Sequence, residues 1–436
     1  MFPNPQDALP LPARPSLAQY KKLAKDLLRI AKSGDTTRPG DQAALTAWSK
    51  NWVDSLVRLS GLVIAPGMPI RIEEWAANVA DFARRRLIES SAKPPVLADA
   101  QFVLARSHGF ASWPEFSRHI DELAHTNSAT AAFEAAADAI VTGDIDLLVR
   151  HLRADLNLIR ARSSREHHAT LLHYTAANGV ENWRQQTPTN IVEIARALLD
   201  NDAEIDATAE MYGGHCTTLG LAATSIHPER AGVQIQLLQF LLDRGARVDC
   251  DNSAGNRQSL IKACFANGRG QAAQFFGNLG QPLNLEEAAG VGRLDLVESF
   301  FNDDKTLKPS ATADQLRNGF LWACQFGRNR IVEFLIARGF DLAAQDRDGQ
   351  TALHHAVIGA QLETVRMLLK YNAQLEVKNV YGGTVLGQAI WSAYNSDSQS
   401  LYIPIIEELL AAGAIIEPDL EDPLARLLRK RAGKPM

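Results

Sequence analysis

The sequence predicts an all-α fold in which a helical bundle precedes a solenoid of repeated helix pairs. Three observations predict it. Apolar residues recur at spacings of three and four through the first 125 residues. Two successive intervals of 33 residues then separate similar segments further along the chain. The composition, 46% hydrophobic and 22% charged over 436 residues, is that of a globular protein and excludes wholesale disorder.

Residues 15–125 carry helical patterns without a repeat. Apolar stripes run from Leu17 to Ala31, from Leu45 to Leu59 and from Ile72 to Phe82, and a fourth helix is predicted from Val96 to His108. We expect a small helical bundle whose Trp and Phe side chains form its core.

A fifth helix of this bundle is predicted to begin after Ser112. The Ser112 hydroxyl is suited to capping free amides, Glu115 is placed to reach back, and Pro114 suits the first turn. The proline-rich residues 1–14 are expected to form a disordered arm.

A repeated pattern begins near residue 130, and its clearest copy runs from Thr351 to Asn379. Asp348 and Gly349 supply a turn before it, and similar segments begin 33 residues earlier at Asn318 and 33 residues later at Thr384. The pattern resembles the ankyrin repeat, a turn followed by two antiparallel helices. The resemblance implies an ankyrin-repeat solenoid over residues 130–417.

Looser copies complete the array. They begin at Thr170, Thr217, Ala263 and Ala288, and an entry repeat is expected from Phe133 to Leu152. This gives seven or eight helix pairs, with a capping helix and a basic tail over residues 418–436. In the ankyrin family the histidine of each motif usually bonds loop backbone, so the resemblance implies structural roles for His173 and His354.

Several segments are similar to bacterial ankyrin-repeat proteins as a group. They are the head motif from Leu97 to His119, the stretch from Tyr212 to Gln234 and the stretch from Tyr381 to Ala389. This resemblance implies a fold and a bacterial origin, and it supplies no common activity.

Two repeats depart from the motif in the same way. Each has a Tyr-Gly-Gly lead-in, at Tyr212 and at Tyr381, and each replaces the motif histidine by glycine, at Gly220 and Gly387. The paired glycines fall in the finger-like turn, where they permit positive φ or close approach of a ligand. A tight turn with no binding role is the simpler explanation.

Three repeats also carry insertions, over residues 181–190, 224–232 and 392–402. Insertions in a solenoid often lie along one face, which is often the binding face, although loops also tolerate length changes at little cost. Aromatic residues at intervals along a concave face would stack on a partner, and about half of them are equally well explained as core. The candidate partner-binding residues are Trp183, Tyr212, Gly213, Gly214, His215, Trp322, Tyr381, Gly382, Gly383, Trp391 and Tyr394.

The sequence contains little that indicates catalysis. His167, His168, His173, His215, Cys216 and His227 fall in two neighbouring copies, but no ligand spacing supports a metal site. We predict no cofactor, and no P-loop, GxGxxG, GxSxG or HExxH motif is present.

Charge and cysteine content limit the partners and the compartment. The net charge of −5 and the absence of a broad basic face argue against nucleic acid. No apolar run is long enough to span a membrane, and no secretory signal is visible. The four cysteines form no recognisable pairing pattern, so we expect a reducing cytoplasm.

The leading hypothesis is a binding protein that recognises a protein or peptide partner through its concave groove and finger loops. The alternative is a hydrolase-type enzyme acting on a small molecule or glycan in an aromatic-lined groove between head and array. A scaffold that oligomerises through its head is the third possibility.

Overall fold

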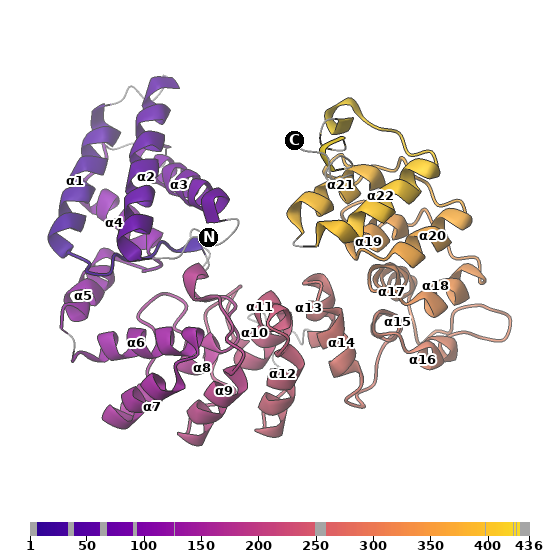
Figure 1. The fold of residues 1–436 in the computed structure, drawn as a ribbon, viewed down its shortest axis with the longest axis horizontal. Coiled ribbons are helices and arrows are strands. Elements are labelled where there is room, and N and C mark those ends of the chain that lie inside the picture. Colours follow the sequence, from indigo (N-terminus) through magenta and orange to yellow (C-terminus); the bar gives the residue numbers. More distant parts are fainter. Residues whose placement is uncertain are drawn as a thin grey trace. The chain divides into compact units, whose positions relative to one another are not determined.

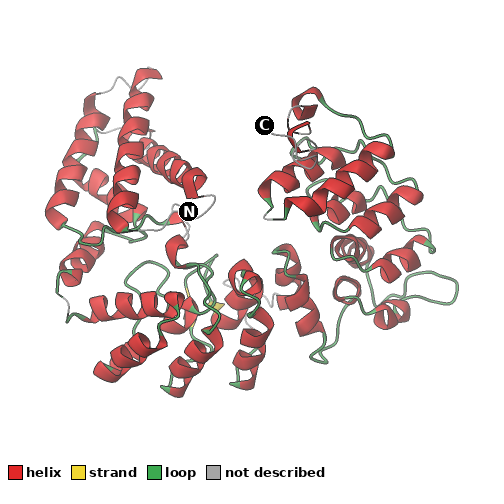
Figure 2. Cartoon of the chain, viewed as in Figure 1, coloured by secondary structure: helices red, strands yellow, loops and turns green. Residues whose placement is uncertain are grey.

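The computed structural model describes residues 7–33, 39–61, 68–89, 94–125, 127–248, 259–396, 398–421, 423 and 425–427. Their secondary structure is almost entirely helical, apart from one short antiparallel pair, β1 (Thr208–Ala209) and β2 (Cys216–Thr217) (Figure 2). None of the helices described is long and apolar enough to span a membrane. The chain divides into two compact units, residues 1–258 and residues 259–436 (Figure 1).

The first unit opens with a bundle whose buried aromatic residues form its core, as predicted. Tyr20, Trp52, Trp75, Phe110 and Phe116 are all buried there. The bundle helices are α1 (Leu17–Ser33), α2 (Pro39–Ser60), α3 (Met68–Arg84) with a π-helical turn at Arg85–Glu89, α4 (Leu97–Ser107) and α5 (Trp113–Leu123). Ser112 caps α5 by accepting a hydrogen bond from the Glu115 amide at 3.4 Å, which is the role its sequence position predicts.

The N-terminal arm is packed from residue 7 onward, so the expectation of disorder over residues 1–14 is wrong for this part. Leu9 is buried, its amide donates to the Ser107 carbonyl at 2.7 Å, and its carbonyl accepts from His108 Nδ1 at 2.9 Å. The prolines prevent a regular sequence pattern here, and the segment is held by the buried side chains of Ala8 and Leu9 and by hydrogen bonds of Leu9 and Ala13. Residues 1–6 lie outside the described residues.

Three helix pairs follow in the first unit. The first helices of the pairs pack against one another in series, and so do the second helices. The pairs are α6 (Ala129–Thr142) with α7 (Ile145–Ala154), α8 (Leu171–Tyr174) with α9 (Ile191–Asp200), and α10 (Thr218–Thr224) with α12 (Gln234–Asp243). The insertion at 224–232 forms an extra short helix, α11 (Ile226–Arg230).

Five more pairs build the second unit on the same plan. The pairs are α13 (Leu260–Ala266) with α14 (Gly270–Gly277), α15 (Leu285–Val291) with α16 (Leu294–Ser299), α17 (Ala313–Gln325) with α18 (Asn329–Ile336), α19 (Ala352–Ile358) with α20 (Leu362–Lys370), and α21 (Val385–Asn395) with α22 (Tyr402–Ala411). Contacts run from α15 through α17 and α19 to α21, and in parallel from α16 to α22. The described residues thus contain eight helix pairs, which confirms the predicted all-α solenoid.

The last pair is covered by the C-terminal segment. A 3₁₀ turn at Pro418–Leu420 packs Leu420 against the core, and Leu427 is buried in it. The part of the predicted capping helix and basic tail that follows Leu427 lies outside the described residues. The proposed boundaries at residues 125 and 417 stay predictions, because the division into units falls between residues 258 and 259.

Close contacts between the backbones of neighbouring helix pairs limit how near the pairs can pack. One such contact leads to a testable prediction. A methyl group added at Gly359 would overlap the backbone carbonyl of Gln325 in the preceding repeat. We therefore expect Gly359→Ala to lower the free energy of unfolding by about 1–3 kcal/mol. Urea denaturation followed by circular dichroism measures this change.

Gly387→Ala is the matched control. Gly387 lies inside α21, where a methyl group would make only ordinary contacts with Leu420 and Thr384. The gain in helix propensity is then expected to leave stability equal or up to about 1 kcal/mol higher. Equal effects of the two substitutions would contradict this account of the repeat spacing.

Candidate functional site

The finger before α21 presents Tyr381 to solvent. The side chain of buried Asn379 accepts hydrogen bonds from the amides of Tyr381 and Gly383, each at 3.0 Å, and Gly382 between them has φ of 81°. The amide of Val380 donates to the Asp348 carbonyl of the preceding finger at 2.9 Å. Tyr381 is 79% exposed on this fixed turn, and Val380 beside it is also exposed. A buried side chain therefore fixes the backbone of the turn, and the Tyr381 ring is left exposed to solvent.

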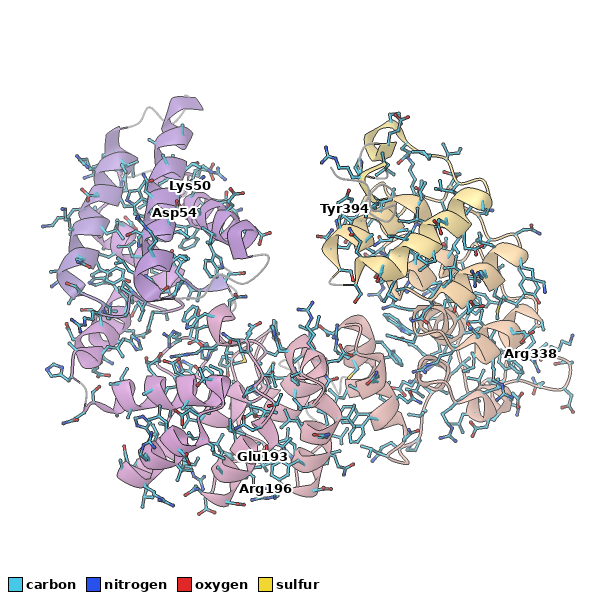
Figure 3. All side chains as sticks on the ribbon, in the orientation of Figure 1. Lys50, Asp54, Glu193, Arg196, Arg338 and Tyr394 are labelled. Atoms are coloured by element: carbon cyan, nitrogen blue, oxygen red, sulfur yellow. The ribbon has the colours of Figure 1, made fainter. Side chains whose placement is uncertain are left out.

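Helix α21 in the same repeat carries two more exposed aromatic residues. Trp391 is 63% exposed, and Tyr394 follows three residues later on the same helix face. Tyr394 is exposed as well (Figure 3). The Tyr394 hydroxyl donates to the Pro423 carbonyl at 2.9 Å, so the C-terminal segment fixes this ring. We call Val380, Tyr381, Trp391 and Tyr394 the last-repeat surface.

Trp322 does not lie open along a groove, and this corrects the sequence prediction. Its ring stacks on Phe265 at 5.5 Å between centroids and meets His355 edge-on at 5.6 Å. Its Nε1 donates to Glu286 Oε1 at 3.2 Å. The half-buried Trp322 ring therefore packs between neighbouring repeats. Phe265 can reach this ring because Gly290 has no side chain in its way.

His355 ties α19 to its neighbours. Its Nε2 lies 2.9 Å from Asp346 Oδ2 in the adjoining finger, and its Nδ1 lies 2.8 Å from Gln325 Oε1 of α17. Burial raises the pKa of Asp346, but the hydrogen bonds from His355 and from the finger backbone outweigh burial and lower it. Both ring nitrogens are engaged, so this His–Asp pair acts as a structural link.

The finger of the first unit has a different backbone from its counterpart. Tyr212, Gly213, Gly214 and His215 all have positive φ, of 50°, 103°, 99° and 59°, whereas Gly383 in the second finger does not. The two Tyr-Gly-Gly segments therefore form different turns. The Tyr212 hydroxyl donates to Asn178 Oδ1 at 2.8 Å, and Tyr212 and His215 are both exposed.

The histidines and the cysteine near this finger have separate roles. His173 is buried, its Nδ1 accepts from the Thr170 amide at 3.1 Å, and its Nε2 donates to the Cys216 carbonyl at 3.2 Å, which is the loop-backbone role predicted for it. His354 repeats this arrangement with the Thr351 amide and the Gly383 carbonyl. The Cys216 thiol donates to the Met211 carbonyl at 3.0 Å. No cluster of three or more possible metal ligands occurs within the described part of the chain.

A buried charge cluster joins the bundle to the first repeats. The Arg165 side chain is 2% exposed, and its Nη1 lies 2.6 Å from Glu134 Oε1 and 2.9 Å from Glu181 Oε1. Arg184, also buried, contacts Glu134 Oε2 at 2.8 Å and Asp138 Oδ1 at 2.7 Å. Arg165, Glu134, Glu181 and Arg184 form the cluster, in which two buried cations face two buried anions.

The charges of the cluster control its protonation. Burial alone raises the pKa of Glu134, but Arg165 and Arg184 outweigh burial and lower the pKa to about 2. The pKa of Glu181 is lowered in the same way, mainly by Arg165 against the effect of burial. Both carboxylates therefore stay ionised, and the cluster holds its charges in pairs.

The segment that carries Arg165 also docks on the bundle. The Glu166 amide donates to the Gly109 carbonyl at 2.9 Å, and the Glu166 carboxylate pairs with Arg106. The Arg165 guanidinium lies 5.6 Å from the centre of the Phe110 ring. His119 Nδ1 lies 2.8 Å from Ser164 Oγ. An ion pair, two hydrogen bonds and a cation–π contact thus join this segment to the bundle.

The first insertion contributes to this cluster instead of a binding loop. Its residues Glu181 and Arg184 are buried, and Trp183 is half-buried with its ring 5.9 Å from the Arg165 guanidinium. Sequence reasoning placed Trp183 on a partner-binding loop and missed the charged residues. No local signal identifies them, because residues separated by up to 50 positions form the cluster and each resembles a surface residue by itself.

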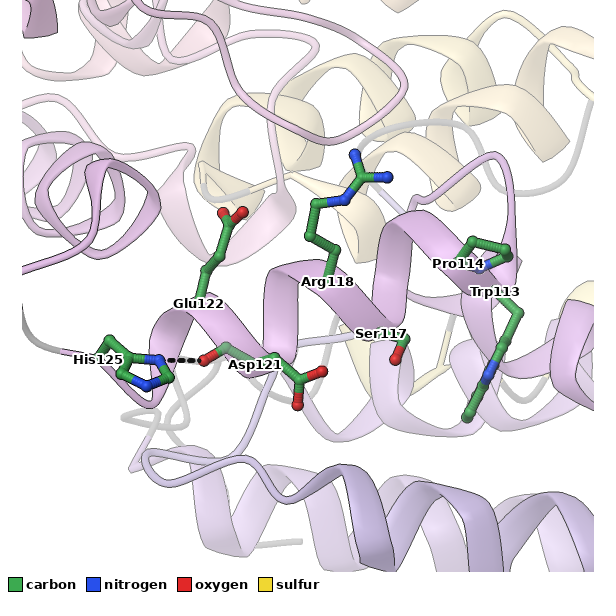
Figure 4. A pocket seen from close by; sticks show the side chains of 7 residues that line it. All are labelled: Trp113, Pro114, Ser117, Arg118, Asp121, Glu122 and His125. Atoms are coloured by element: carbon green, nitrogen blue, oxygen red, sulfur yellow. Dashed lines mark hydrogen bonds between the residues drawn. The ribbon is translucent and has the colours of Figure 1, made fainter.

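The bundle has a shallow depression along α5. It is lined by Trp113, Pro114, Ser117, Arg118, Asp121, Glu122 and His125. Arg118 and Glu122 leave the helix on one side and Trp113 and Asp121 on another (Figure 4). His125 Nδ1 donates to the Asp121 carbonyl at 2.9 Å. Among the residues that line this depression, no titratable groups converge as they would in an active site.

The stacked helix pairs, fingers and capped helix starts define the class of the protein, an α-helical repeat solenoid. More specifically, the sequence profile for ankyrin repeats in three copies matches residues 285–379 and 320–419. Residues 285–419 of the chain therefore carry ankyrin repeats.

Two similar proteins carry the same repeats. A putative ankyrin repeat protein of Acanthamoeba polyphaga mimivirus is 36% identical over 78 residues, which cover 18% of this chain and 17% of that protein. An ankyrin repeat and KH domain-containing protein of Caenorhabditis elegans is 28% identical over 198 residues, which cover 43% of this chain and 7% of that protein. The match spans less than a fifth of the length of each. These viral and nematode relatives give no support to a bacterial origin.

The cluster predicts the effect of removing its central cation. Arg165→Met leaves Glu134 and Glu181 buried with one guanidinium between them, so we expect a loss of about 3–5 kcal/mol in the free energy of unfolding. Arg165→Met with Glu181→Gln restores one cation to one anion and is expected to recover part of the loss. Urea unfolding of both variants measures these changes. A free energy of unfolding for Arg165→Met within about 1 kcal/mol of the wild-type value would contradict the prediction.

Acid is expected to destabilise the first unit through its buried histidines. Burial lowers the pKa of His108 to about 3, and lowers those of His119 and His173 to about 4, from 6.5. The unfolded chain binds these protons below pH 6.5 while the folded chain does not. Stability is therefore full above pH 6.5 and falls as the pH drops towards 4, by up to about 1.4 kcal/mol per pH unit for each histidine.

Urea unfolding at pH 7.5, 6 and 5 tests this expectation. His108→Asn removes one titrating group and should make the dependence of stability on pH less steep by about a third. The same dependence in the variant and the wild type would show that His108 does not carry the effect.

Proposed function

We propose that this protein binds a protein or peptide partner through the last-repeat surface. The observation that carries the proposal is the exposure of Tyr381 on a turn that buried Asn379 fixes from below. The two hydrogen bonds fix the backbone of the turn, and the exposed Tyr381 ring that it carries adds no buried apolar area to the fold. Aromatic side chains held in this way are typical of interface hot spots.

The finger and the helix supply complementary parts of this surface. Tyr381 and Val380 project from the turn, while Trp391 and Tyr394 form one ridge of α21. Val380 is joined to the neighbouring finger through the Asp348 carbonyl, so the turn is supported on two sides. A rigid surface loses little conformational entropy on binding, which favours affinity. The partner segment we propose therefore carries apolar side chains that cover these rings.

The finger of the first unit is proposed as a second contact. Tyr212 and His215 are exposed there, and Gly213 and Gly214 allow the backbone turn that presents them. Two non-glycine residues with positive φ carry a conformational cost, which is frequent at functional turns. The enzyme and glycan-binding alternatives are not proposed, because no described group of residues favours them.

The proposal places the protein in a reducing compartment such as the cytoplasm. Cys216, Cys264 and Cys324 are free thiols, and the last two are buried. Burial raises the pKa of Cys324 well above its ordinary value, so this thiol is protonated and unreactive.

A peptide selection tests the proposed function. Peptides are selected from a random display library on the wild-type chain, and the affinity of each is measured by titration calorimetry. We expect Tyr381→Ala with Trp391→Ala to weaken binding at least 100-fold, because hot-spot aromatics each carry 2 kcal/mol or more.

The control removes two other exposed apolar side chains of the second unit, by Tyr371→Ala with Leu279→Ala. This variant is expected to bind within twofold of wild type. Selection of the same peptides by the wild type and the Tyr381/Trp391 variant would overturn the proposed site.

A further inference from the structure

Helix α1 carries a row of cations along one exposed side. Lys21, Lys25, Arg29 and Lys32 follow one another at spacings of four, four and three residues, and all are exposed. The spacing places them on one stripe about 16 Å long, since each helical residue rises about 1.5 Å. Lys22 lies beside the stripe and is also exposed.

The stripe lacks matching carboxylates within the described residues. The only acidic residue of α1 is Asp26, which lies 3.3 Å from Arg29. No described carboxylate pairs with the lysines of the stripe. The cations at the end of α3 are paired by contrast, because Asp81 contacts Arg84 and Arg85, and Asp99 lies 2.9 Å from Arg86.

The stripe works against the stability of its own helix. Like charges four residues apart repel, and this applies to Lys21 with Lys25 and to Lys25 with Arg29. The helix dipole favours only Lys32, which lies in the last turn, and does not offset these repulsions in the helix interior. The arrangement is thus not explained by helix stability.

An apolar floor lies beside the cations. A shallow groove is lined by Lys25, Leu28, Arg29 and Lys32 of α1 and by Leu97, the first residue of α4. Leu28 and Leu97 are half-buried, and Val96, next in sequence to Leu97, is 57% exposed. Three cations therefore border an aliphatic surface.

Positive charge is also concentrated in the part of the chain that contains this groove. Residues 1–125 contain 16 Lys and Arg against 13 Asp and Glu, a net charge of +3. Residues 126–436 contain 29 Lys and Arg against 37 Asp and Glu, a net charge of −8. The bundle is therefore the basic part of an acidic protein, and its cations attract anionic partners.

We propose that this groove binds an acidic amphipathic helix of a partner protein. Carboxylates spaced three or four residues apart along such a helix match the spacing of the stripe, because both helices have the same rise per residue. Aliphatic side chains between those carboxylates cover Leu28, Leu97 and Val96. This surface is separate in sequence and chemistry from the last-repeat surface, and it does not depend on the proposed function.

An aliphatic floor distinguishes this partner from other polyanions. Nucleic acid is bound by cations together with aromatic or hydrogen-bonding groups, and Leu28 and Leu97 offer neither. Insertion into a bilayer requires large exposed apolar side chains beside the cations, and among the described residues Leu28 and Leu97 of the groove are half-buried while only the neighbouring Val96 is exposed. The chemistry of the groove therefore favours an acidic helix with apolar residues.

The probe is a fluorescein-labelled 18-residue helical peptide with Glu at positions spaced four, four and three apart and Leu between them. Its affinity for the full chain is measured by fluorescence anisotropy at 50 and 200 mM salt. We expect Lys21→Gln, Lys25→Gln and Lys32→Gln together to weaken binding at least tenfold and to reduce its salt dependence. Leu97→Asn is expected to weaken binding about fivefold with the salt dependence unchanged.

The matched control removes three exposed cations elsewhere, by Arg150→Gln, Arg153→Gln and Lys370→Gln. This variant is expected to bind the peptide within twofold of wild type, and circular dichroism checks that every variant is folded. Equal losses in the stripe and control variants would overturn the proposal, since net charge alone would then explain binding.

Three competing ligands complete the test. A peptide with Gln in place of Glu, and a polyglutamate of equal charge without Leu, are each expected to bind at least tenfold more weakly than the probe. Tighter binding of single-stranded DNA or of phosphatidylserine vesicles than of the probe would overturn the proposal in favour of a nucleic acid or a membrane surface.

Discussion

A single helix pair of this solenoid leaves one apolar face uncovered, and the rest of the structure depends on covering it. Inside the second unit each first helix packs on the next, from α15 to α21, so the faces cover one another. The ends have no such neighbour. Helix α5 of the bundle contacts α6 at the first repeat, and the segment that ends at Leu427 covers the last repeat. The first repeat and the last repeat are therefore covered in different ways.

The end at the bundle is joined largely by polar groups. Arg165 lies between Glu134 and Glu181, and its guanidinium also faces Phe110 of the bundle. Apolar residues of similar volume would stabilise such a junction at least as well, because burying charges costs solvation free energy. Arg165 reaches both carboxylates through Nη1, and such charge-assisted hydrogen bonds are directional, whereas apolar contacts are not. We interpret the cluster as the feature that fixes the orientation of the bundle on the first repeats.

The sequence was sufficient where a local pattern decides the structure. The 33-residue period predicted the helix pairs, Ser112 predicted a cap, and the repeat motif predicted the role of His173. The sequence was insufficient where contacts with residues distant in the sequence decide the structure. Trp322 is half-buried because Gly290, in the preceding repeat, leaves space for Phe265. Two identical Tyr-Gly-Gly segments form different turns, because Asn379 fixes one of them and has no counterpart two residues before Tyr212.

The two exposed surfaces lack different interactions, so the partners that we propose for them differ. At Tyr381 and Trp391 the rings lack an apolar cover, so burial of area is the available gain. On α1 no described carboxylate pairs with Lys21, Lys25 or Lys32, so pairing of charge is the available gain. Both features weaken the isolated fold, through exposed apolar area in one case and repulsion of like charges in the other. Stability alone does not maintain either feature. A partner with apolar side chains would cover the rings, and a partner with carboxylates would pair with the lysines. Binding of such partners is the explanation that we propose for both features.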